Sequence, residues 1–136
     1  MNTQSLEAPW FEVIFAQFEN EALKRALEKC AREIDYKIWY GEPGSPDIFA
    51  IGHFVEVIEW PLLGSEIWNF YLEYCKETND DTPCIIIEKN KTHSFPSLEM
   101  PKVKKWLYID SIDRDSTMQM IAFIKKIKSN LKEKIL

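Results

Sequence analysis

The feature that most constrains the fold is an unbroken run of apolar residues at positions 83–87 (PCIII). A run of this length fits a strand better than a helix, and apolar side chains on both of its faces indicate a strand covered on both sides. Strands of this kind occur in parallel sheets whose connections are helices. The run therefore predicts an α/β protein with helices on both faces of its sheet.

The rest of the chain alternates between strand-like and helix-like segments. Apolar, β-branched and aromatic composition predicts strands at 10–18, 36–40, 83–87 and 106–109. Helical periodicity predicts helices at 21–33, 65–78 and 115–134, the first with Asn20 as its N-cap. With one more strand between 47 and 60, we predict a single α/β domain over residues 1–136. It would be a three-layer sandwich with a mostly parallel five-stranded sheet and helices on both faces.

Apolar stripes in two of these helices predict which face lies against the sheet. In helix 65–78 the stripe consists of Ile67, Phe70, Tyr71, Tyr74 and Cys75. In helix 115–134 it consists of Met120, Ile121, Ile124, Ile127, Leu131 and Ile135. We expect both sets to be buried.

The segment 47–60 (DIFAIGHFVEVIEW) has two interpretations. It can form two short antiparallel strands, 48–51 and 54–57, joined by a turn at Gly52 and His53. It can also form a turn of helix at 46–52, with Ser45 as N-cap, followed by one strand at 54–59. Strand propensity favours the first but does not exclude the second.

Composition and charge bound the classes of function. The net charge of −5 argues against a general nucleic-acid binder. Residues 123–136 nevertheless hold five lysines (125, 126, 128, 132 and 134) against Glu133, so this basic C-terminal helix could bind an acidic partner. The sequence lacks an apolar run of the ~18 residues that a membrane span needs, and its first residues lack a signal-peptide pattern. We therefore expect a cytoplasmic protein with no membrane partner.

Cofactor motifs are absent from the sequence. The only histidines, His53 and His93, are forty residues apart and belong to no zinc-binding motif. The three cysteines form neither a CxxC pair nor a disulfide framework, and the four glycines form neither a GxGxxG pattern nor a P-loop. No metal or other cofactor is therefore assured by a motif.

Six stretches in order resemble a Toll/interleukin-1 receptor (TIR)-like domain of the flavodoxin-like group. They are VIFAQFENE, YKIWYGEPG, FVEVIEW, LGSEIWNFYLEY, PCIII and WLYIDSIDRD. The resemblance implies a signalling or self-association module whose partner is a protein or a like domain. It also implies NAD as the candidate cofactor, because enzymatic members use a glutamate on the helix after the third strand to cleave it.

The residues of this chain that match the NAD-cleaving pattern are Glu73 and Trp68. The family places its glutamate four residues after the tryptophan, and that position holds Leu72 in this chain. Because one residue turns a side chain by about 100° around a helix, the resemblance implies little or no NAD cleavage.

A weaker resemblance is to a degenerate PD-(D/E)xK nuclease fold. Asp47 follows Pro46 as in the PD of that family, and Glu56 stands where its ExK motif begins. In the hairpin interpretation Asp47 and Glu56 share one face, where they would hold a divalent metal acting on nucleic acid. The position of the family's lysine is occupied by Ile58.

Overall fold

The computed structural model describes residues 12–42, 45, 53–60, 65–88, 105–109 and 112–135. Its strands are β1 (Val13–Gln17), β2 (Lys37–Tyr40), β3 (Val55–Trp60), β4 (Cys84–Glu88) and β5 (Trp106–Ile109). Its helices are α1 (Glu21–Ile34), α2 (Ser65–Thr78) and α3 (Arg114–Ile135). Each predicted strand and helix of the described part is present, with bounds that differ by up to three residues.

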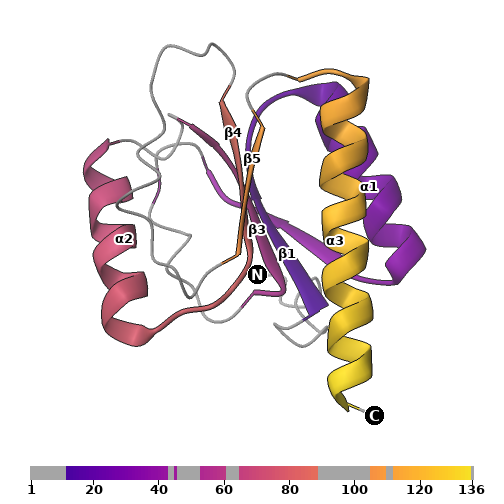
Figure 1. The fold of residues 1–136 in the computed structure, drawn as a ribbon. Coiled ribbons are helices and arrows are strands. Elements are labelled where there is room, and N and C mark those ends of the chain that lie inside the picture. The colour runs from indigo at the N-terminus through magenta and orange to yellow at the C-terminus, as the bar shows by residue number, and fades with distance from the viewer. Residues whose placement is uncertain are drawn as a thin grey trace, which may run out of the picture.

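The sheet has the strand order β2-β1-β3-β4-β5, and all four pairings are parallel. Figure 1 shows α2 on one face of this sheet, and α1 and α3 together on the other. The predicted three-layer α/β sandwich with a parallel five-stranded sheet is confirmed.

Both faces of the sheet are packed, and β4 contributes to both. Ile85 and Ile87 belong to the core under α1 and α3, whereas Ile86 belongs to the core under α2. All three are 0% exposed. The apolar run therefore has the role that its composition predicts, because alternate side chains of a strand point to opposite faces.

Helix α1 begins where its sequence predicts and ends one residue later, at Ile34. The Asn20 side chain accepts a hydrogen bond from the Leu23 amide at 2.9 Å, which confirms Asn20 as the N-cap. At the other end Asp35 adopts φ 62°, and its amide donates to carbonyls of the last turn. A left-handed residue with such bonds is a common helix terminator.

The pairing of β3 excludes the hairpin interpretation. Glu56 lies between Phe15 of β1 and Cys84 of β4, so both edges of its strand are occupied by parallel neighbours. An antiparallel strand 48–51 has no free edge to pair with at residues 54–57. The strand of the other interpretation, 54–59, is present as Val55–Trp60; the turn predicted at 46–52 lies outside the described residues.

The predicted inner face of α2 is wrong in part. Tyr71 and Cys75 are buried as expected, but Phe70 is 59% exposed and Tyr74 is 38% exposed. Trp68 and Leu72 are buried in their place. Both sets have helical spacing, and aromatic contacts with the sheet distinguish them: Trp68 stacks on Tyr71 and meets the ring of Trp106 edge-on.

The inner face of α3 agrees with its prediction as far as its side chains are described. Met120, Ile124 and Ile127 are buried, and Ile121 packs partly against the same core. Among the residues that the structure describes, no helix is both long and apolar enough to cross a membrane.

Candidate functional site

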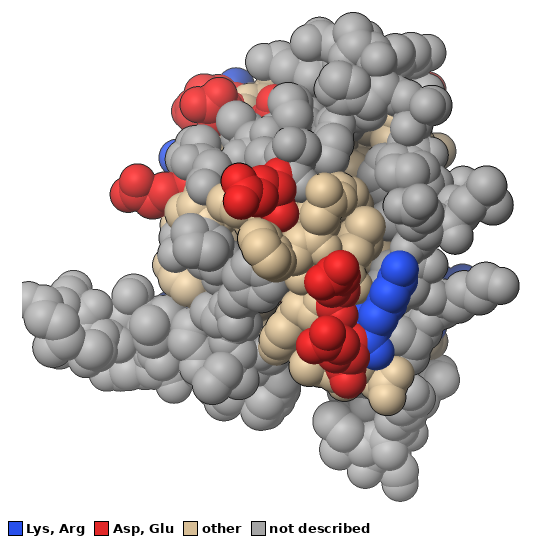
Figure 2. Space-filling view, turned by 90° about the vertical axis from the view of Figure 1, so that its left-hand side faces the viewer, with Lys and Arg blue, Asp and Glu red and all other residues tan. Residues whose placement is uncertain are grey.

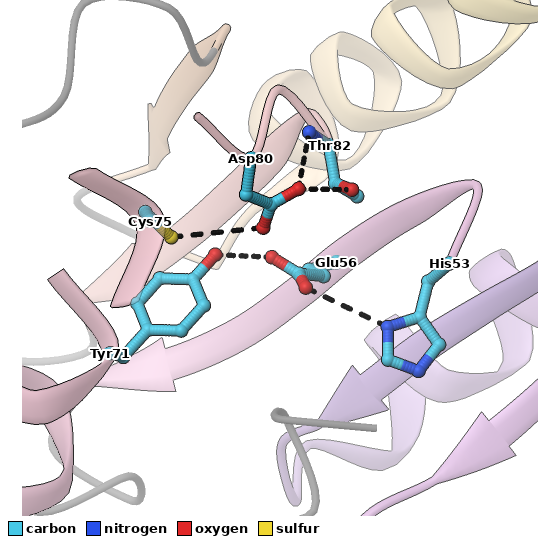
Figure 3. Close-up of polar contacts among 6 residues, drawn as sticks. All are labelled: His53, Glu56, Tyr71, Cys75, Asp80 and Thr82. Carbon is cyan, nitrogen blue, oxygen red and sulfur yellow. Dashed lines mark hydrogen bonds and ion pairs between the residues drawn. The ribbon is translucent and has the colours of Figure 1, made fainter. Parts of the chain in front are cut away.

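A buried polar cluster lies between the sheet and α2 (Figure 3). The Tyr71 hydroxyl donates a hydrogen bond to Oε1 of Glu56, and Nδ1 of His53 lies 3.6 Å from Oε2 of the same carboxylate. Tyr71 is 0% and Glu56 3% exposed. A carboxylate this far from water is stable only with donors around it. Tyr71 supplies one, and His53 lies on the other side of the carboxylate, beyond hydrogen-bond distance.

Each member of this cluster is placed by a regular element. The alternation of β3 turns Glu56 and Ile58 toward α2, and the spacing of α2 turns Tyr71 toward β3. His53 lies two residues before β3, and its ring stacks on Phe15 of β1 with centroids 5.0 Å apart. The cluster is therefore as rigid as the sheet and helix that carry it.

Burial, and then the negative charge of Glu56, raises the pKa of Tyr71 well above its ordinary value. Tyr71 accordingly stays protonated and acts as a donor at any physiological pH. Because His53 lies 3.6 Å from the carboxylate, beyond hydrogen-bond distance, these three side chains do not form a continuous path for a proton. Since their exposed fractions do not exceed 6%, a substrate cannot reach them in this conformation.

A second polar group closes the turn between α2 and β4. Asp80 accepts hydrogen bonds from the Thr82 amide at 3.1 Å and its hydroxyl at 2.8 Å. The Cys75 thiol, 3.7 Å away, donates to the other carboxylate oxygen (Figure 3). These bonds fix the C-terminal end of α2. They thereby also fix the position of Tyr71, four residues before Cys75.

The carboxyl edge of the sheet is the usual ligand site in this architecture. The strand order reverses between β1 and β3, and nucleotides in such folds bind beside that reversal, with phosphate on helix amides. Here the Glu19 amide donates to the Glu59 carboxylate at 3.1 Å, and the Leu23 amide donates to Asn20. Two amides that a phosphate would use are thus bound by the chain's own side chains.

The same edge is acidic. Glu59 is 5% exposed and Glu19 is exposed, so a bound phosphate would meet two carboxylates there. Beside them Gln17 is fully buried, and its amide donates to the Glu42 carbonyl. The edge is therefore unfavourable for a dinucleotide.

The NAD candidates Glu73 and Trp68 lie on different sides of α2. Trp68 is 3% exposed, in the core, whereas Glu73 is exposed on the outer face. Five residues of helix turn a side chain by about 140°, which accounts for the separation. Leu72, at the family's glutamate position, is buried with Trp68.

In the part of the chain that the structure describes, the two nuclease candidates are not found together. Glu56 is in the buried cluster, and Asp47 lies outside the described residues. Among the residues that the structure describes, no three acidic, histidine or cysteine side chains are grouped so that they could hold a metal ion. The shared hairpin face on which the pair depends does not form.

Sequence reasoning missed the roles of Tyr71, His53 and Glu59. A signal was present: Glu56 and Glu59 stand three residues apart in one strand, so they point to opposite faces. In a strand covered on both faces, each such carboxylate requires a buried donor.

Comparisons of the chain with family models, with curated proteins and with solved structures give no match.

Proposed function

We propose that this chain is a protein-association module of TIR-like type, with little or no NAD-cleaving activity. The observation that carries the proposal is the orientation of α2. The helix buries Trp68 and Leu72 and presents Phe70 and Glu73 to solvent. Tyr74, one turn beyond Phe70, is also exposed, and an apolar patch with charged residues around it is typical of a protein-binding surface.

The geometry also argues against efficient NAD cleavage. Such a reaction needs a carboxylate near the ribose to stabilise the positive charge that develops as nicotinamide leaves, in a site that excludes water. Glu73 is exposed, so it has no such surroundings. At the carboxyl edge, Glu19 and Glu59 oppose binding of the pyrophosphate.

Two measurements test the proposal. Sedimentation velocity over a hundredfold range of concentration should show reversible association of the purified chain. Nicotinamide release from NAD, followed over hours at high protein concentration, should stay at the rate of the Glu73→Ala control. A monomer at every concentration refutes the association role, and strong turnover that disappears in Glu73→Ala refutes the non-catalytic one.

A further inference from the structure

The outer face of α2 combines an apolar anchor with acidic charge. Glu66, Asn69, Phe70 and Glu73 line a shallow hollow of about 230 Å³. The charged residues of this helix are three glutamates and one lysine. Figure 2 looks at the side of the molecule that α2 covers, and it shows acidic side chains beside uncharged surface. A partner for this face therefore needs an apolar contact and a positive charge about one helical turn apart.

The outer face of α3 has the complementary pattern. Met118, Ala122 and Lys126 follow one another at four-residue intervals, and all three are exposed. Side chains at this spacing line one face of a helix. Met118 is 57% exposed, and the small Ala122 beside it lets another helix approach closely. The helix as a whole carries six basic and two acidic residues.

Among the lysines of α3 whose side chains the structure describes, Lys126 is the one best placed to meet a partner. Lys125 forms an ion pair with Glu33 of α1 at 2.7 Å. Lys128 donates to the Ile34 carbonyl and is only partly exposed. Lys126 is exposed on the same stripe as Met118.

We propose that α2 of one copy binds α3 of a second copy, with Phe70 against Met118 and Ala122, and Glu73 against Lys126. This inference rests on the proposed self-association and specifies its interface. We assign a second copy of this chain as the partner because its two faces are complementary. The α2 face combines an apolar anchor with acidic charge, and the α3 face combines an apolar anchor with basic charge. Helix rise puts Glu73 about 4.5 Å along the axis from Phe70, and Lys126 about 6 Å from Ala122 and about 12 Å from Met118, so Glu73 reaches Lys126 when Phe70 lies at Ala122.

The arrangement of the layers determines the kind of assembly. α2 and α3 cover opposite faces of the sheet (Figure 1), so a contact between them joins unlike surfaces of the two copies. Each added copy leaves one α2 face and one α3 face available. Such a contact continues into a chain of copies unless the rotation between neighbours closes a ring.

Charge reversal followed by sedimentation velocity tests the interface. Glu73→Lys and Lys126→Glu should each weaken association about tenfold, because each puts like charges opposite one another. The double variant Glu73→Lys/Lys126→Glu should associate nearly as well as the wild type, since exchanging the two charges restores an attractive pair across the contact. Phe70→Ala should also weaken association about tenfold, through loss of the aromatic anchor.

The controls separate the interface from the association itself. Lys29→Glu reverses an exposed charge on α1 and should leave association unchanged. All the substituted side chains are exposed, and circular dichroism verifies that each variant folds. If the wild type associates but the single variants match it, or the double variant stays weak, the α2–α3 interface is refuted while self-association stands. A wild type that remains monomeric refutes both.

Discussion

Replacing Tyr71 by phenylalanine should destabilise the fold far more than the loss of one hydroxyl from a surface tyrosine. The substitution leaves the ring in place and removes the donor to the Glu56 carboxylate. A hydrogen bond to a charged group contributes about 1.5–3 kcal/mol, and the burial of the Glu56 carboxylate puts the cost at the upper end. Because Tyr71 is 0% exposed, water cannot replace the hydroxyl. We expect a loss of about 3 kcal/mol.

Urea denaturation, followed by tryptophan fluorescence and circular dichroism, measures this loss. For a slope of about 2 kcal/mol per molar urea, the midpoint should fall by about 1.5 M. Tyr108→Phe is the control, because that side chain is 37% exposed and water can take the place of its hydroxyl. Its midpoint should change by less than about 0.3 M.

A double-mutant cycle isolates the contribution of the charge. In a Glu56→Gln background, Tyr71→Phe removes a hydrogen bond to a neutral amide, which contributes about 1 kcal/mol. The effect of Tyr71→Phe should therefore shrink by about 2 kcal/mol in that background. Equal effects in both backgrounds would show that Tyr71 does not act through the carboxylate, and the reasoning would fail.

Two further predictions concern the core and alkaline pH. Ile86→Ala should cost about 2–5 kcal/mol, since Ile86 is 0% exposed in the central strands; an unchanged urea midpoint would contradict its place there. Burial raises the pKa of Tyr71 and of Tyr40, so the folded state keeps both protons above pH ~10, where the unfolded state loses them. The contribution of these two tyrosines to stability should be constant below pH ~10 and then fall, by about 1.4 kcal/mol per pH unit for Tyr71 alone, and Tyr71→Phe should show a shallower fall.

The order of elements was predictable because each signal is local. The apolar run at 83–87 and the capping residue Asn20 specify a buried strand and a helix start without reference to the rest of the chain. The orientation of α2 was not predictable in the same way. Its sequence offers two apolar stripes with the same spacing, and contact with Trp106, 38 residues beyond Trp68, selects between them.

The partners of Glu56 in the polar cluster could not be predicted from the sequence for a related reason. Glu56 in a buried strand signals that a donor must exist, but its identity depends on which face of α2 meets β3. The predicted inner face of α2 contained both Tyr71 and Tyr74, and the sequence alone does not say which hydroxyl meets Glu56. Only the packing of α2 on β3 selects Tyr71.

The strand order has a consequence for how the chain folds during synthesis. β1 pairs first with β2, 24 residues on along the chain, and only later with β3, which begins at residue 55. Until β3 leaves the ribosome, one edge of the fully buried strand Val13–Gln17 has no neighbour. Open edges of this kind recruit other strands, and pairings between distant segments form slowly. The nascent chain therefore has an open strand edge that other strands can join in the interval between the emergence of β2 and that of β3.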